Sequence, residues 1–126
     1  MGRIRVLIAD DHSLFAQALE AILGTDDRFE IVALAKNGGQ AVELADSLDP
    51  DVVLMDISMP VLDGFAATKQ LRKKRPDLPV LMLTGSNSRA DVDASREAGA
   101  SGYVTKDRIA SELVAAIVEV TRRRLP

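Results

Sequence analysis

Five short apolar runs recur along the chain, and each is bounded by turn residues. They are rich in Val, Ile and Leu and span residues 4–9, 31–35, 52–55, 80–83 and 102–104. A strand with one face in water alternates apolar and polar residues, whereas a continuous apolar run is typical of a strand that is covered on both faces. The pattern therefore predicts five strands of a parallel sheet with helices on both sides.

The stretches between these runs carry apolar residues at the three- and four-residue spacing of a helix face. The first four end at helix stop signals, which are Gly24, Asp49-Pro50, Arg75-Pro76 and Gly99. The segment 89–98 offers the least apolar area, so we expect it to be the weakest and most mobile helix. Strand and helix alternate five times, which is too few for an eight-stranded barrel. The predicted fold class is α/β, an open, doubly wound (βα)5 parallel sheet.

Composition narrows the classes of function. The 126 residues are 47% hydrophobic and 28% charged, which is typical of one domain with a buried core. No apolar run approaches the roughly 18 residues of a membrane span, and no secretory leader is evident, so we expect a soluble, cytoplasmic protein without a membrane partner. The net charge of -3 argues against direct nucleic-acid contact by this domain.

The residue types available for chemistry are also limited. The chain has no cysteine and a single histidine, His12, which rules out a thiolate metal site and argues against a Ser/His/Asp triad. We expect His12, at the start of a helix and without an evident orienting partner, to be structural. Any metal ion must therefore be held by oxygen atoms, which directs attention to the acidic residues.

Charged and polar residues follow four of the predicted strands. They are Asp10 and Asp11 after the first, Asp56 after the third, Thr84 after the fourth and Lys106 after the fifth. The carboxyl ends of parallel strands meet at one edge of the sheet, where ligands bind in such folds. Converging carboxylates repel one another unless a cation intervenes. Magnesium, which takes few carboxylates, several waters and a phosphate oxygen, suits this set best.

The motifs at these positions resemble those of the response-regulator receiver domain of bacterial two-component systems, most closely the NarL/FixJ branch with its LuxR-type helix-turn-helix. The resemblance covers essentially the whole chain. It implies a flavodoxin-like sheet with strand order 2-1-3-4-5. Its carriers are Asp10-Asp11-His12-Ser13, the segment 55–60 with Asp63-Gly64, Thr84-Gly85, and the segment 98–107 that contains Gly102-Tyr103-Val104-Thr105-Lys106.

The resemblance also implies a role for each site residue. Asp56 is the phosphoacceptor, which takes a phosphoryl group from a sensor histidine kinase and forms an aspartyl phosphate. The ligands of Mg²⁺ are Asp11, Asp56, the carbonyl of Ser58 and, chiefly through a water, Asp10. The phosphoryl oxygens are held by Lys106, the hydroxyl of Thr84 and the N–H groups of Ser58 and Gly85.

Signal output is expected to depend on Thr84 and Tyr103. When Thr84 reaches toward the phosphoryl group, Tyr103 can turn inward and change the surface of the fourth helix, fifth strand and fifth helix. The resemblance implies that the domain controls a DNA-binding output domain. It also allows the domain to form a homodimer on phosphorylation. Residues 1–126 then form a single receiver domain. The chain is either a stand-alone receiver or a piece of a transcription factor whose DNA-binding domain is absent from it.

Several alternatives remain open from the residues alone. Asp10 or Asp11 could simply cap the helix that begins near Ser13. A magnesium-dependent phosphatase of the haloacid-dehalogenase kind also uses an aspartate nucleophile on a doubly wound sheet, although Ser58 stands where that family needs a second acid. A receiver-like interaction module that ignores phosphate is a third reading. The leading hypothesis is a regulated phosphoacceptor and not an enzyme with turnover.

Two positions depart from the receiver pattern. Asp107 follows Lys106 where many receivers have a proline with a cis peptide bond, and a cis bond before a non-proline residue would cost about 2.5 to 4 kcal/mol, so we predict a trans bond. Gly85 replaces a slightly larger small residue, which predicts a more flexible loop there. Ser58 and Ser86 are expected to flank the site and to leave room for a water that attacks the aspartyl phosphate.

Overall fold

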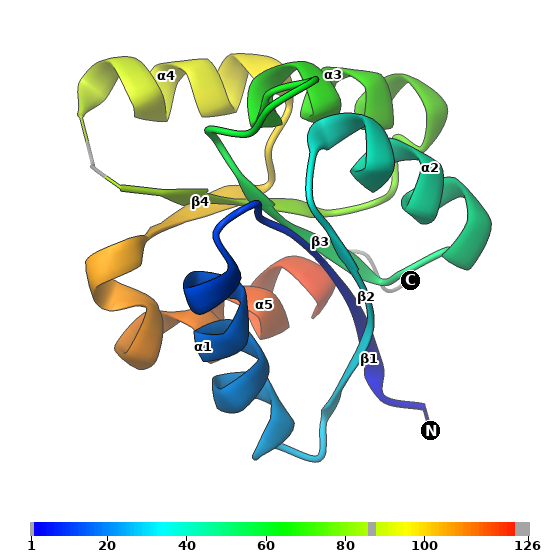
Figure 1. Cartoon of the computed structure of the whole chain (residues 1–126), viewed down its shortest axis with the longest axis vertical. Helices are drawn as coiled ribbons and strands as arrows, with labels where there is room; N and C mark the ends of the chain where they lie inside the picture. Colours follow the sequence, from blue (N-terminus) through cyan, green and yellow to red (C-terminus); the bar gives the residue numbers. More distant parts are fainter. Residues whose placement is uncertain (1, 86–87, 123–126) are drawn as a thin grey trace.

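Five parallel strands form one sheet in the order β2-β1-β3-β4-β5 in the computed structural model, which describes residues 2–85 and 88–122 (Figure 1). This order confirms the expectation from the resemblance. The strands are β1 (Ile4–Ala9), β2 (Phe29–Ala35), β3 (Val52–Asp56), β4 (Val80–Thr84) and β5 (Gly102–Thr105). Strands β3 and β4 are buried along their whole length, as continuous apolar runs predict.

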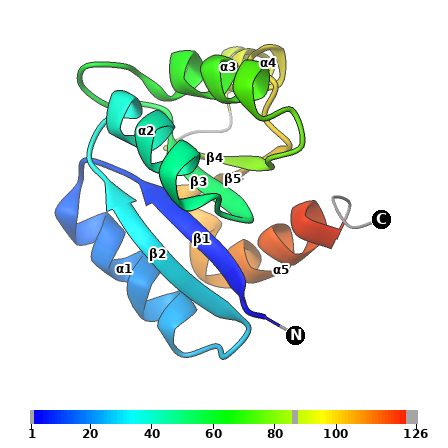
Figure 2. The same cartoon turned by 90° about the vertical axis from the view of Figure 1, so that its right-hand side faces the viewer.

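Helices cover both faces of the sheet. They are α1 (Ser13–Gly24), α2 (Gly38–Leu48), α3 (Gly64–Lys74), α4 (Arg89–Ala98) and α5 (Ile109–Arg122), with a short 3-10 helix, η1 (Lys106–Arg108), after β5. Figure 2 shows α1 and α5 on one face and α2 and α3 on the other. Within the described residues, no helix has the length and apolarity that a membrane span requires.

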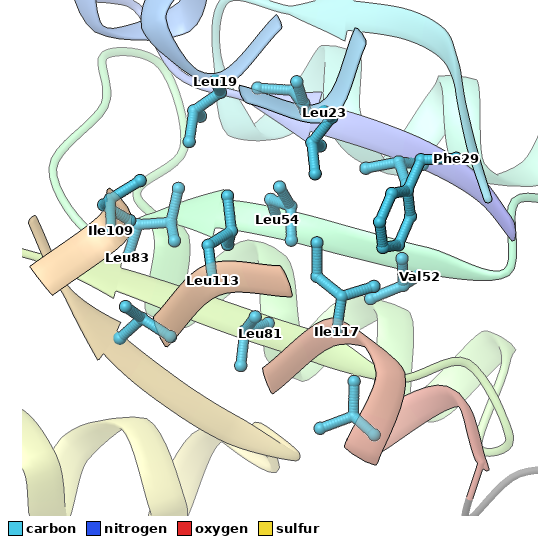
Figure 3. Close-up of a cluster of buried hydrophobic side chains, with 14 residues drawn as sticks. Leu19, Leu23, Phe29, Val52, Leu54, Leu81, Leu83, Ile109, Leu113 and Ile117 are labelled. Atoms are coloured by element: carbon cyan, nitrogen blue, oxygen red, sulfur yellow. The ribbon is translucent and has the colours of Figure 1, made fainter. Parts of the chain in front are cut away.

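Two apolar clusters, one on each face, hold these layers together. Alternate residues of one strand contribute to different clusters, since Val6 and Ile8 face α1 and α5 while Leu7 and Ala9 face α2 and α3. Figure 3 shows the first cluster, in which Leu113 and Ile117 of α5 pack over the centre of the sheet. Each face of the sheet therefore has its own apolar core.

The observed boundaries follow the predicted ones closely. Strand β2 begins at Phe29, two residues before the predicted start, because Ile4 and Phe29 are register partners at the beginning of β1. Helix α4 spans the predicted residues and buries only Ser95 and Ala98, so its small buried area is confirmed. Gly99 ends α4 with a φ of 98°, a left-handed conformation that glycine adopts without a steric cost.

Candidate functional site

The register of the sheet brings the predicted site residues to one edge. Ala9 is the partner of Met55, so Asp10 and Asp56 follow at the same level of neighbouring strands. Thr84 is paired with Thr105 at the ends of β4 and β5, and Lys106 comes directly after that pair. Residues that are far apart in the chain thus meet at the carboxyl edge, as the rule for open α/β sheets predicts.

Three carboxylates and one imidazole form a compact cluster there. Asp10, Asp11, His12 and Asp56 each offer one oxygen or nitrogen atom, and these four atoms lie within 4.8 Å of one another. The side chains of Asp10 and Asp56 are only 0% and 4% exposed, whereas that of Asp11 is 32% exposed. The backbone N–H of His12 donates to Asp10 Oδ1 at 2.8 Å and helps to orient that carboxylate.

Lys106 is the cation that faces this cluster. Its Nζ atom lies 3.3 Å from Asp56 Oδ1 and 3.8 Å from Asp10 Oδ2. The same Nζ atom stands 4.4 Å from the centre of the Phe15 ring, a distance at which the face of an aromatic ring attracts a cation. Helix η1 and α1 therefore hold the ammonium group over the carboxylates.

Burial raises the pKa of the Asp56 carboxyl above its ordinary value, and the charge of Asp10 raises it further. The ammonium group of Lys106 and the His12 ring oppose this rise, because positive charge favours the ionised carboxylate. Asp56 is thus a carboxylate whose charge is not fully neutralised by its protein neighbours. Additional positive charge at the site would stabilise its ionised form.

The cluster fits a hard divalent cation such as Mg²⁺. Among the described residues, three buried side-chain atoms lack a hydrogen-bond partner, and two of them are Asp10 Oδ2 and Asp56 Oδ2. A buried polar atom without a partner is costly, and oxygen-rich clusters of this type are the sites that Mg²⁺ prefers. The donor atoms present therefore suit the cation that the sequence predicts.

A hollow of about 280 Å³ opens beside the buried carboxylate. It contains all the residues that the sequence predicts for phosphoryl contact, namely Ser58, Thr84, Gly85 and Lys106, together with Asp56. Thr84 is 2% exposed, while Ser58 and Gly85 lie at the open rim. The hollow therefore places the buried Asp56 carboxylate beside groups that can donate hydrogen bonds. Ser86, predicted to flank the site, lies outside the described residues.

The loop after β3 is shaped by Asp63 and Gly64. The N–H of Gly64 donates to the carbonyl of Ile57 at 2.8 Å, and a Cβ atom on Gly64 would come within 2.2 Å of the Asp56 carbonyl oxygen. Asp63 caps α3 by accepting a hydrogen bond from the N–H of Ala66 at 2.8 Å. These contacts explain why an Asp-Gly pair follows β3: the start of α3 must pack against the backbone of Asp56.

Two interpretations of the residues near β1 prove wrong. The residue before α1 is His12, whose side chain makes no capping hydrogen bond, and Asp10 and Asp11 do not cap the helix either. His12 is not without an orienting partner, because its Nδ1 atom lies 3.2 Å from Asp10 Oδ1 and from Asp11 Oδ1, and 3.6 Å from Asp56 Oδ2. Asp10 and Asp11 belong to a cluster with Asp56, and the ammonium group of Lys106 lies beside it. Neither Asp56 nor Lys106 is near Asp10 in the sequence, so a local pattern does not reveal these contacts.

Tyr103 lies apart from the phosphoryl hollow. It is 43% exposed and lines a separate depression with Thr105, Arg108 and Glu112. Asp107 follows Lys106 through a trans peptide bond, as predicted. The structure therefore shows the proposed switch tyrosine turned outward, on β5 beside the start of α5.

Sequence reasoning misses two residues of the site. The pattern around His12 favours a structural role, although its position directly after two strand-end aspartates is a signal for the site. Asp91 lines the hollow from the first turn of α4. A helical residue far from any strand end carries no comparable signal, so only the packing of α4 over the hollow reveals it.

Comparison with known proteins identifies the same family that the sequence motifs resemble. The family described as response regulator receiver domain matches residues 6–118. The transcriptional regulatory protein DegU of Brevibacillus brevis is 39% identical over 121 residues, which cover 96% of this chain and 51% of that protein. A protein-glutamate methylesterase/protein-glutamine glutaminase of Aliivibrio fischeri is 39% identical over 133 residues, 96% of this chain and 35% of that protein.

Among solved structures, the signal receiver domain of NarL from Mycobacterium tuberculosis superimposes with a TM-score of 0.92 at 30% sequence identity. The match covers 97% of this chain and 98% of that domain. By contrast, the chain spans about half the length, or less, of the curated relatives it matches. The receiver domain is thus the part that these proteins share with it.

Proposed function

This chain belongs to the response regulator receiver domain family, and from that membership we propose that it is a phosphoacceptor in which Asp56 takes a phosphoryl group from a histidine kinase. The observation that carries the proposal is the convergence of buried Asp56 with two further aspartates and Lys106 beside one open hollow. Receiver domains of two-component systems interact with histidine kinases, which supports this class of donor.

In the proposed reaction, one carboxylate oxygen of Asp56 attacks the phosphorus atom of a phosphohistidine. The new O–P bond forms as the N–P bond breaks, and the imidazole of the kinase leaves with the electron pair of that bond. Asp56 must be ionised to attack. Lys106, 3.3 Å from Asp56 Oδ1, favours the ionised form and would also attract the oxygens of the transferred group.

Asp10, Asp11, Asp56 and the carbonyl of Ser58 would hold Mg²⁺, which when bound supplies positive charge against the carboxylates and the phosphoryl oxygens. The hydroxyl of Thr84 and the N–H groups of Ser58 and Gly85 would orient those oxygens from the rim and wall of the hollow. Positioning and charge neutralisation are the main requirements of phosphoryl transfer, and these residues supply both.

Phosphorylation by a small donor tests the proposal. Incubation with acetyl phosphate and Mg²⁺ should add one phosphoryl mass to the protein, and Asp56→Asn should remove that gain. Asp63→Asn is the matched control, because Asp63 is an acid of the same loop that caps α3 and is not one of the clustered acids. An unmodified wild-type protein, or equal modification of Asp56→Asn, would refute the assignment.

A turnover enzyme is the main competing reading. In our proposal, the domain is itself phosphorylated and dephosphorylated at one residue and does not catalyse repeated turnover of a separate substrate. Multiple turnover of a small phosphate ester by the isolated domain, lost in Asp56→Asn, would instead support the phosphatase alternative. Ser58, two residues after Asp56, cannot serve as the second acid of that mechanism.

We assign the output to transcription control, because the DegU relative is named a transcriptional regulator and the chain covers about half of it. In this proposal residues 1–126 form the receiver domain, and a DNA-binding domain carries out the response. The methylesterase relative shows that similar receivers also occur in an enzyme. The receiver itself has a net charge of -3 and is not expected to contact DNA.

The proposed switch couples Thr84 to Tyr103. Thr84 is buried at the end of β4, and Tyr103 is exposed on the neighbouring strand β5. A phosphoryl group that bonds the Thr84 hydroxyl would favour the state in which Thr84 moves toward the hollow and Tyr103 turns inward. The surface of α4, β5 and α5 changes as a result, and that surface would support a homodimer of the phosphorylated form.

Tyr103 reports on this switch directly, because the chain has one tyrosine and no tryptophan. Beryllofluoride, a stand-in for the phosphoryl group, should change the tyrosine fluorescence of the wild-type protein in the presence of Mg²⁺. Thr84→Val keeps the shape of the side chain but removes the hydroxyl, so the fluorescence change should be lost or much reduced. A response that Thr84→Val leaves intact would contradict the coupling, and no response in the wild type would favour a phosphate-independent module.

A further inference from the structure

The proposed cation site contains one group that an all-oxygen magnesium site does not need, the imidazole of His12. Its Nδ1 atom lies 3.2 Å from Asp10 Oδ1, 3.2 Å from Asp11 Oδ1 and 3.6 Å from Asp56 Oδ2. The ring is otherwise open to solvent, since the side chain is 61% exposed. One nitrogen atom thus faces three carboxylates while the rest of the ring stays accessible.

These separations are those of atoms that can share one ion. Nitrogen and oxygen ligands lie roughly 2.0–2.2 Å from a transition metal, which places neighbouring ligand atoms about 3.0 Å apart in an octahedral site and about 3.4 Å apart in a tetrahedral one. The distances from Nδ1 to Asp10 Oδ1 and Asp11 Oδ1, both 3.2 Å, fall within that range, and the 3.6 Å distance to Asp56 Oδ2 is slightly longer. The nitrogen therefore occupies a vertex of the same polyhedron as the carboxylate oxygens.

A second feature points to a cation at this position. Asp56 Oδ2 is buried without a hydrogen-bond partner, and it is the atom of Asp56 that faces His12. Asp10 Oδ2 is likewise buried without a hydrogen-bond partner, although Lys106 Nζ lies 3.8 Å from it. Asp10, Asp11 and Asp56 each offer a carboxylate oxygen within 4.8 Å of the imidazole nitrogen, which makes a mixed oxygen and nitrogen ligand set.

Such a set does not bind all divalent ions alike. Mg²⁺ prefers oxygen and gains little from imidazole, whereas imidazole suits Zn²⁺ and Ni²⁺ well. The affinity of nitrogen-containing sites also rises along the first transition row from Mn²⁺ toward Cu²⁺. An imidazole ligand would therefore raise the affinity for late transition metals and leave that for Mg²⁺ nearly unchanged.

From this geometry we infer that His12 Nδ1 is a metal ligand, and that the phosphoacceptor site of this chain binds late first-row ions such as Zn²⁺ or Ni²⁺ through it. The inference rests on the divalent cation site of the proposed function and adds its selectivity. His12 makes the site sensitive to the identity of the available metal. With Mg²⁺, His12 stays unligated and the oxygen atoms hold the ion.

The chain offers an unusually clear test, because it has one histidine and no cysteine. Ring signals of His12 are followed by NMR in tag-free protein at one fixed pH during titration with Zn²⁺ alone or Mg²⁺ alone. Zn²⁺ should shift the signal of the Nδ1 atom strongly, and Mg²⁺ should shift it much less, because Mg²⁺ acts on the ring only through the neighbouring carboxylates. Binding of Zn²⁺ without any effect on the ring would overturn the inference.

Calorimetry with two variants separates ligation from hydrogen bonding. His12→Ala should weaken Zn²⁺ binding by about tenfold or more, which is about 1.4 kcal/mol, and change Mg²⁺ binding by less than about threefold. His12→Asn can still donate a hydrogen bond to Asp10 but lacks the imidazole, so it should lose Zn²⁺ affinity as His12→Ala does. Equal changes for both ions, in either direction, would overturn the inference.

The same titrations distinguish this inference from the proposed function. If the wild type binds Mg²⁺ but Zn²⁺ leaves the His12 ring unaffected, only the ligand role of His12 fails. If Zn²⁺ binds through His12 and Mg²⁺ does not bind, the magnesium-dependent function fails and the ligand role stands. If neither ion binds, both are overturned.

Discussion

At the scale of single residues, the main feature of the site is the buried carboxylate of Asp56, whose negative charge its neighbours offset only in part. Asp56 is 3% exposed, and burial and the charge of Asp10 both disfavour its ionised form. Lys106 offsets part of this effect from 3.3 Å. The carboxylate that the proposed reaction needs ionised thus lies in a place that penalises its charge, which lowers the stability of the folded protein.

Replacing Asp56 should therefore stabilise the metal-free protein, with a defined pH dependence. The raised pKa means that Asp56 destabilises the folded state when it is ionised, at pH values above its folded pKa, and no longer does so below the ordinary pKa of 3.8. In EDTA, Asp56→Asn should raise Tm by a few degrees at pH 7, and this gain should shrink as the pH falls toward 4.

Thermal unfolding across this pH range, followed by circular dichroism, measures the effect. Asp63→Asn serves as the control, because asparagine caps a helix about as well as aspartate and Asp63 lies on an exposed loop. It should show no gain of this kind. A Tm difference between Asp56→Asn and wild type that stays constant with pH would contradict the explanation.

At the scale of elements, the site depends on how closely helix starts approach strand ends. Helix α3 begins at Gly64, whose backbone packs against the last residue of β3. Helix α2 begins at Gly38, where a Cβ atom would meet the carbonyl oxygen of Leu62 at 2.0 Å. Both glycines allow a backbone contact that fixes the loop carrying Ser58, and neither contact leaves room for a side chain.

Gly64→Ala should accordingly destabilise the fold. A Cβ atom 2.2 Å from the Asp56 carbonyl oxygen forces the backbone to move, and overpacking of this kind costs about 1–3 kcal/mol. Gly24→Ala is the matched control, because Gly24 ends α1 without a left-handed φ, and a Cβ atom added there would meet nothing within 4 Å. That change should be neutral or stabilise by up to about 1 kcal/mol. Chemical denaturation of both variants measures the difference, and equal stabilities would refute the packing argument.

At the scale of the whole molecule, the ligands of the proposed cation come from the carboxyl ends of β1 and β3 and are assembled only by the complete sheet. An unfolded chain does not hold Asp11 and Asp56 together. A cation that binds this cluster therefore binds the folded state and stabilises it by mass action. Stability and cation binding are linked through the same three carboxylates.

Added Mg²⁺ should thus raise the Tm of the wild-type protein. At ten times the dissociation constant the expected stabilisation is about 1.4 kcal/mol, a shift of several degrees for a domain of this size. Asp11→Asn should reduce the shift, whereas NaCl at the same ionic strength should not reproduce it. An equal Tm rise in Asp11→Asn and wild type would show that Mg²⁺ acts elsewhere.

Much of this molecule could be predicted from local pattern. The continuous apolar runs placed the strands to within about two residues at each end, and stop residues such as Gly24 and Gly99 marked where helices end. They suffice because strand burial, helical spacing and turn preference are properties of neighbouring residues. The rule that ligands gather at strand ends then selected Asp10, Asp56 and Lys106, which the structure brings together.

The rest depended on contacts between distant residues. The strand order was available only through the resemblance, because nothing local states which strand lies beside which. The direction of the His12 ring follows from carboxylates on two strands, and the outward position of Tyr103 follows from the packing of β5 and α5. The sequence by itself thus determined the elements and most residues of the site, except His12 and Asp91. Tertiary structure alone decided which side chains face one another, since burial and electrostatic contact exist only once the strands have paired.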